Sequence, residues 1–78
     1  MKLSNFVEGL KTLQPYYKDG DGYHIGAEHD QFYAYQTDNP LTPEDVQKMI
    51  NLDWFQPEGG INSDGGVYDP ENGWSAFT

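Results

Sequence analysis

The sequence predicts an α+β fold in which two short helices lie on one face of a small antiparallel sheet, in the order α-β-β-α-β-β. Three observations predict it: apolar residues at helical spacing near the start, two β-prone runs joined by a short polar link, and a strong helix-start signal at Thr42. With 15% aromatic residues, the 78-residue chain can form one small core. We therefore expect a single small acidic domain, residues 1–78, with a Gly/Asp/Pro-rich loop at 57–72.

The first helix is predicted near the N-terminus, where Ser4 or Asn5 can cap its start. It ends near Gln14, because Pro15 cannot continue a helix. Gly9 inside it costs about 1 kcal/mol relative to alanine. The apolar residues with the spacing of a buried stripe are Leu3, Phe6, Val7, Leu10 and Leu13.

A β-hairpin is predicted from the runs 23–27 and 32–36, which a four-residue polar link separates. If Ala27 pairs with Phe32, one face carries Tyr23, Ile25, Ala27, Phe32 and Ala34. The other face then carries His24, Gly26, Tyr33 and Tyr35. We expect the first face to be the core face. A three-residue link would instead turn Tyr33 and Tyr35 inward.

The second helix follows from its start signals, with Thr42 at the N-cap and Pro43 at the first helical position. Leu41 and Val46 can form a hydrophobic staple. The buried stripe is predicted to be Val46, Met49 and Ile50. Asn51 is predicted as a left-handed cap.

Two further strands are predicted around residues 54–56 and 73–77, joined by the loop 57–72. Loops of this length are uncommon in compact domains, and they are usually functional or mobile.

Charge is the strongest global signal, with 13 acidic residues against four lysines and a net charge of -9. This balance excludes direct nucleic-acid binding, which requires basic residues at the phosphates. It favours a basic surface on another protein as the partner. Duplex DNA carries about 18 phosphate charges over ~30 Å, so the chain reaches about half the charge density of a nucleic acid. The same acidity also fits the simpler role of keeping a small protein soluble.

Neither cysteines nor long apolar segments occur, so the sequence predicts no disulfide framework, no signal peptide and no membrane span. We expect a soluble protein of the cytoplasm. The oligomeric state is left open.

The segment GAEHD, residues 26–30, is the main candidate for chemistry. None of the three serines, Ser4, Ser63 and Ser75, lies in an elbow-like setting, and a domain of this size offers little concavity for an acid–base pair, so we expect no enzymatic activity and no cofactor. An alternative is a small metal-binding domain built from His24, His29 and nearby carboxylates, although the spacing matches no established motif. The turns at residues 19–21 and 62–65 fail the EF-hand pattern for calcium.

The competing interpretation of GAEHD is a polar hairpin link in which Gly26 leaves room for an aromatic neighbour such as Tyr33. The sheet face opposite the helices then shows tyrosines ringed by acids, and tyrosine is enriched at protein interfaces. Simple packing of amphipathic strands accounts for the tyrosines equally well. The candidate partner-binding residues are Tyr33, Tyr35, His24, Glu28, His29, Asp30, Asp19 and Asp21.

Three segments, DGYHIGAEHDQFYAY, LTPEDVQKMINLDWF and YDPENGWSAF, resemble small acidic uncharacterised proteins of phages and prophage-bearing bacteria. The resemblance runs from about residue 20 to the end, and the Gly-rich part at 59–66 is longer than is typical of the group. It implies an accessory protein of a mobile element, for which inhibition of a host defence or regulatory protein is a natural role. An acidic structural or accessory subunit of a phage particle or enzyme is the other alternative.

Overall fold

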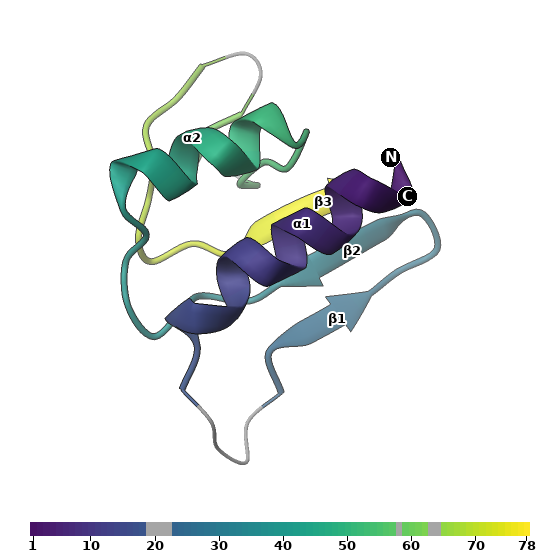
Figure 1. The fold of residues 1–78 in the computed structure, drawn as a ribbon, viewed down its shortest axis with the longest axis horizontal. Coiled ribbons are helices and arrows are strands. Elements are labelled where there is room, and N and C mark those ends of the chain that lie inside the picture. The colour runs from purple at the N-terminus through teal and green to yellow at the C-terminus, as the bar shows by residue number, and fades with distance from the viewer. Residues whose placement is uncertain (19–22, 58, 63–64) are drawn as a thin grey trace.

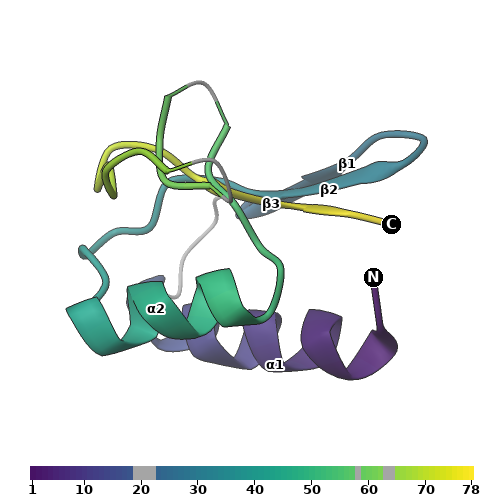
Figure 2. The same ribbon diagram turned by 90° about the horizontal axis from the view of Figure 1, so that it is seen from above.

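The computed structural model describes residues 1–18, 23–57, 59–62 and 65–78, and it confirms the α+β class (Figure 1). The elements are α1 (Leu3–Leu13), the 3-10 turn η1 (Gln14–Tyr16), β1 (Ile25–Ala27), β2 (Gln31–Ala34), α2 (Pro43–Asn51) and β3 (Trp74–Phe77). The three strands form one antiparallel sheet in the order β1-β2-β3, with β2 in the centre. Both helices lie on the same side of this sheet (Figure 2).

The predicted order of elements was wrong in one detail, because a single strand rather than two follows α2. Residues 54–56 contribute only one bridge, in which Phe55 exchanges hydrogen bonds of 3.0 and 2.7 Å with Ser75. The next residue, Gln56, donates its backbone N–H to the Ile61 carbonyl at 2.8 Å. Because Gln56 bonds to the loop and not to β3, the pairing with β3 stops after one residue.

The predicted hairpin register is confirmed, since Ala27 pairs with Phe32. Ala34 on the expected core face is 2% exposed, and Phe32 packs against the core. Ile25 on the same face stays 56% exposed, and Tyr23 is 93% exposed. The outer strand β1 is thus much less covered by the helices than β2.

Helix α1 begins two to three residues earlier than its predicted caps, Ser4 or Asn5, with Lys2 at the N-cap and no capping side chain. Two of the five residues predicted to be buried on α1, Leu3 and Val7, are exposed. Gly9 is buried in their place, because the Trp54 indole packs on it: a Cβ at Gly9 would lie 2.1 Å from Trp54 Nε1. The close approach of the indole therefore requires this glycine, which the sequence alone marked only as a weakness of the helix.

Helix α2 starts as predicted, with the Thr42 hydroxyl accepting a hydrogen bond of 3.3 Å from the Asp45 N–H and Pro43 at the first position. Val46 and Met49 are buried. The predicted left-handed cap at Asn51 was wrong. Asn51 still belongs to the helix, and Asp53 has the positive φ of 67° instead.

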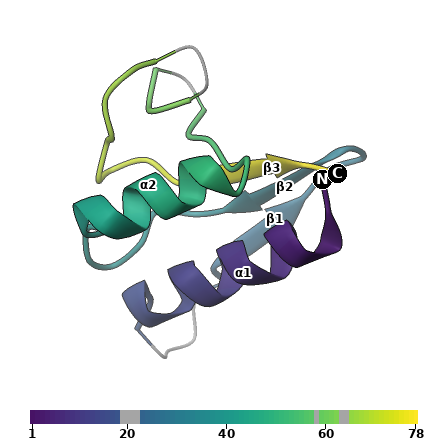
Figure 3. The same cartoon turned by 45° about the horizontal axis from the view of Figure 1, so that its top comes forward.

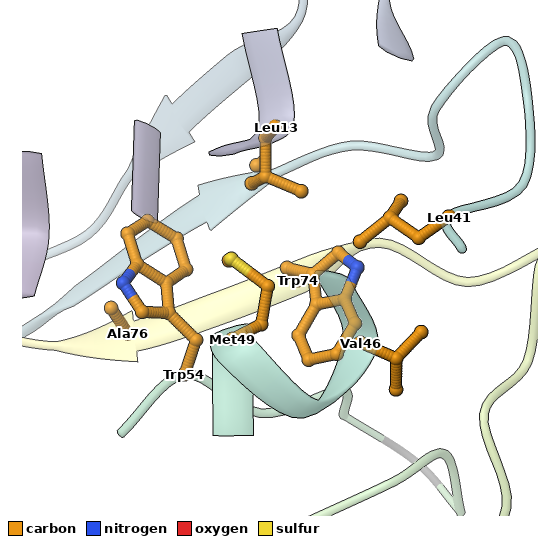
Figure 4. Packing of buried hydrophobic residues seen from close by; sticks show 8 residues of the cluster. Leu13, Leu41, Val46, Met49, Trp54, Trp74 and Ala76 are labelled. Carbon is orange, nitrogen blue, oxygen red and sulfur yellow. The ribbon is translucent and has the colours of Figure 1, made fainter. Parts of the chain in front are cut away.

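The core fills the space between the helices and the sheet. Its buried apolar residues are Leu13, Ala34, Leu41, Val46, Met49, Trp54, Trp74 and Ala76. Figure 4 shows Met49 of α2 between the indoles of Trp54 and Trp74. Phe6 of α1 extends this cluster, with its ring centroid 5.8 Å from that of Trp54 and 4.9 Å from that of Phe32.

The loop that follows Phe55 is tied to the domain by one buried side chain, Gln56, which is 1% exposed. Its Nε2 donates to the Asp69 carbonyl at 2.8 Å and to the Asn72 carbonyl at 3.2 Å. Its Oε1 accepts from the backbone N–H groups of Asp69 at 2.9 Å and Ile61 at 3.3 Å. Four backbone groups of the described loop residues are satisfied by this single amide, so both ends of the loop have fixed positions.

Candidate functional site

The sheet face opposite the helices carries the candidate site, and in the described part of the chain no helix lies on it (Figures 2 and 3). We call it the open sheet face. Strand register and the Phe55 bridge give its residues as Gly26, Gln31, Tyr33, Tyr35, Phe55, Ser75 and Phe77. Tyr33 holds the centre, between Gly26 of β1 and Ser75 of β3.

Tyr35 lies across β1, because Gly26 has no side chain. A Cβ at Gly26 would lie 2.3 Å from the Tyr35 hydroxyl oxygen. The expectation that an aromatic residue covers Gly26 is therefore confirmed, but the residue is Tyr35 rather than Tyr33. Tyr35 remains 50% exposed. Part of its ring is thus available to a partner.

The carboxylates of the hairpin link gather at Tyr33. The Tyr33 hydroxyl is hydrogen-bonded to Glu28, and Asp30 and Tyr35 lie near enough to interact with it electrostatically. Desolvation of the hydroxyl and then the negative charges of Glu28 and Asp30 raise the pKa of Tyr33 above its ordinary value of 10.0. Both acids of GAEHD therefore form one cluster with the central tyrosine of the open sheet face.

Two further aromatic residues on this face, Phe55 and Phe77, were missed by sequence reasoning. Their rings stack with centroids 4.9 Å apart, and Phe77 is 59% exposed. The alternation in residues 74–77 was the available signal, because it puts Ser75 and Phe77 on one face once Trp74 is taken as buried. The position of Phe55 depends on its bridge to Ser75, which no local pattern predicts.

His24 is not beside Tyr33, in contrast to its predicted position on the same face. Its ring stacks on Tyr17 at the end of α1, with centroids 4.7 Å apart and an interplanar angle of 20°. The Tyr17 hydroxyl donates to the Tyr35 carbonyl. Burial and the nearby charge of Asp38 raise the pKa of Tyr17 to about 12. Because its ring stacks on a residue outside the sheet, the His24 side chain does not lie on the face that strand alternation predicts.

The remaining predicted residues are only partly placed. His29 is exposed at the hairpin tip. Asp19 and Asp21 lie outside the described residues, so their part in the surface stays a prediction.

No three residues among the described histidines, aspartates and glutamates lie close enough together to hold a metal ion. Of the serines, Ser4 is exposed in the first turn of α1, Ser63 lies outside the described residues, and Ser75 is buried in β3. Among the described residues, neither His24 nor His29 belongs to a group that could hold a metal ion.

A shallow hollow of about 170 Å³ lies where the loop meets the open sheet face. Tyr33 and Tyr35 line it from the sheet, and Pro57, Glu71 and Asn72 line it from the loop. Glu71 thus adds a third carboxylate at the border of the aromatic surface.

Comparisons of the chain with protein-family models, with curated proteins and with solved structures found no match. The phage-protein resemblance therefore stays a prediction. Among the described residues, neither helix is long and apolar enough to cross a membrane.

Proposed function

We propose that this chain is a non-enzymatic protein-binding accessory protein of phage or mobile-element type. Its open sheet face binds a basic surface on a host or phage protein. The observation that carries the proposal is the arrangement at Tyr33, where an uncovered aromatic surface meets the carboxylates of Glu28 and Asp30. Aromatic anchors give a partner area to bury, and carboxylates give a preference for lysine and arginine.

The partner class follows from the charge. The molecule is 34 Å along its longest axis, a length over which duplex DNA carries about 20 phosphate charges. A net charge of -9 is about half of that. We infer that the chain acts as a partial nucleic-acid mimic, which occupies the basic site of a nucleic-acid-binding protein, such as one of a host defence system, and blocks its normal ligand.

The aromatic residues supply binding energy that the net charge alone does not. Charge steers association and makes it sensitive to salt, whereas buried aromatic anchors hold the complex once it has formed. Tyr33, Tyr35 and Phe77 lie on the same face of the sheet, so one partner surface can cover all three. Tyr33 is half-buried, whereas Tyr35 and Phe77 are exposed.

The test is affinity purification of a tagged chain from a bacterial lysate at low and at high salt, followed by mass spectrometry of the retained proteins. We expect a basic nucleic-acid-binding protein to be retained at low salt and largely lost at high salt. Recovery of a partner that is not basic, or of one whose retention does not depend on salt, contradicts the electrostatic mechanism. Retention of phage structural proteins instead supports the alternative of an acidic accessory subunit.

A matched pair of variants tests the aromatic part. Tyr33→Thr combined with Tyr35→Thr keeps β-propensity and removes both rings, and we expect it to lose the partner. Val67 lies in the loop and is 80% exposed. Val67→Ser removes this apolar side chain, which is not part of the open sheet face, and we expect the variant to retain the partner. Equal retention by the two variants rules out the open sheet face as the binding surface.

A further inference from the structure

The outer edge of β1 presents backbone groups that have no backbone partner among the described residues. The Tyr35 N–H donates to the His24 carbonyl at 2.9 Å, so His24 belongs to a hydrogen-bonded pair of the β1–β2 ladder. Residues of an antiparallel strand turn their N–H and C=O groups alternately toward the two edges. Ile25 and Ala27 therefore direct theirs away from β2. Among the described residues, no strand pairs with that edge.

An apolar groove runs beside this edge, between α1 and β1. Its volume is about 370 Å³, and its lining includes Val7, Leu10 and Leu13 of α1 and Ile25 of β1. Val7 is 38% exposed and Ile25 is 56% exposed, so the apolar wall is accessible from outside. The charged residue of the lining, Lys11, lies 3.8 Å from Glu8. Unpaired backbone groups and exposed apolar side chains thus occur together on one flank of the domain.

These two features fit an extended peptide, because a strand added to β1 bonds to its free edge and points alternate side chains to the two faces of the sheet. The side chains that point toward α1 enter the groove. The side chains that point the other way come out beside Tyr35 and near the hairpin link, which carries Glu28 and Asp30. The peptide side chains that enter the groove must be apolar. Those on the side of Tyr35 and the hairpin link should be basic, because Glu28 and Asp30 lie there.

Charge decides between a partner and a second copy of this chain as the occupant. Pairing two β1 edges brings together two chains of net charge -9, each with Glu28 and Asp30 at the end of the strand. A basic segment gains from the same charges.

We propose that the outer edge of β1 accepts an extended basic segment of the partner as an additional strand, with its apolar side chains in the groove between α1 and β1. The inference rests on the proposed function, and it names the segment through which that partner is held.

The experiment uses the whole chain, isotope-labelled for nuclear magnetic resonance, and a synthetic octapeptide of alternating lysine and valine as the probe. At low salt we expect peptide binding to shift the backbone amide signals of Ile25 and Ala27 and to slow their exchange with solvent. We also expect shifts of the Val7 and Leu10 methyl signals. Peptide binding that shifts signals of Tyr33 and Phe77 and leaves those of Ile25 and Ala27 unchanged overturns the edge-strand inference, although it is compatible with the proposed function.

Two other outcomes also contradict the inference. If the peptide does not bind at low salt while the lysate partner is still captured, the edge does not take such a segment. If the signals of Ile25 and Ala27 instead shift with protein concentration in the absence of peptide, the edge pairs with a second copy of this chain.

Variants separate backbone pairing from general changes. Ala27→Pro removes an outward N–H that has no partner in β2, and edge strands tolerate proline, so we expect peptide affinity to fall about five- to tenfold. Ala27→Val keeps the N–H, and we expect it to bind as the natural chain does. Val7→Gln tests the groove if Ala27→Pro does not fold, and we expect it to weaken binding at least threefold. Unchanged affinity in a folded Ala27→Pro chain and in Val7→Gln overturns the inference.

Discussion

The two faces of the sheet are built from alternating residues of the same strands, but they are filled in different ways. On the helix side, Ala34, Trp74 and Ala76 are at most 2% exposed. On the open side, Tyr35 and Phe77 are at least half exposed, and carboxylates gather beside Tyr33. In our proposal the helix side supplies stability and the open side binds the partner. Changes on the helix side should therefore alter the free energy of unfolding more than changes on the open side.

The largest effect is expected for Trp54→Ala on the helix side. The indole is 2% exposed and stacks on Phe6, so its removal should lower the free energy of unfolding by about 3–5 kcal/mol. Chemical denaturation measured by circular dichroism checks this. A loss below about 1 kcal/mol would show that Trp54 is not a central part of the core.

Gly9→Ala is expected to destabilise the chain by about 1–3 kcal/mol, although alanine favours a helix by about 1 kcal/mol over glycine. The reason is the overlap of the new methyl group with the Trp54 indole. The same substitution in a Trp54→Ala background is the control, and there it should stabilise the helix. Stabilisation by Gly9→Ala alone would contradict the packing described for α1.

Stability should fall with alkaline pH, because the pKa of Tyr17 is about 12 in the folded chain and about 10 in the unfolded chain. Below pH 10 the tyrosine is protonated in both states, and its contribution is fully present. Between about pH 10 and 12 the unfolded chain binds fewer protons, so the free energy of unfolding decreases. Thermal melts of the natural chain and of Tyr17→Phe across this range provide the check, and the variant should show a smaller decrease. Parallel curves for the two proteins would mean that Tyr17 titrates normally.

The smallest effect on stability is expected on the open side. Glu28→Gln combined with Asp30→Asn keeps the shape of two exposed side chains and should change the free energy of unfolding by no more than about 0.5 kcal/mol. Denaturation curves of the double variant and the natural chain check this expectation. A larger loss would give the carboxylates at Tyr33 a structural role and remove the contrast between the two faces.

The features that the sequence predicted correctly depend on local signals. The start of α2 follows from the hydroxyl of Thr42 and the fixed φ of Pro43, which act within one turn. The hairpin register follows from a period of two and a short link. The roles of Gly9 and Gln56 could not be predicted from local signals. Gly9 contacts Trp54 and Gln56 contacts Asp69, and each partner lies far along the chain.

The candidate site divides in the same way. Tyr33 and Tyr35 share the open side because alternation in one strand requires it, and their carboxylate neighbours follow from the adjoining link. The stacking of His24 on Tyr17 and that of Phe55 on Phe77 need contacts between separate elements. Patterns within single segments therefore found the centre of the site and missed its borders.

The most direct test of the central claim is the affinity of the captured partner for two charge-matched variants, measured by isothermal titration calorimetry. Glu28→Gln with Asp30→Asn changes the open side, and Glu44→Gln with Asp53→Asn changes exposed acids at the two ends of α2. Each pair removes two negative charges and takes the net charge from -9 to -7. We expect the first pair to weaken binding at least tenfold and the second to weaken it less than threefold. Equal losses in the two variants would show that overall charge, and not the open sheet face, determines binding.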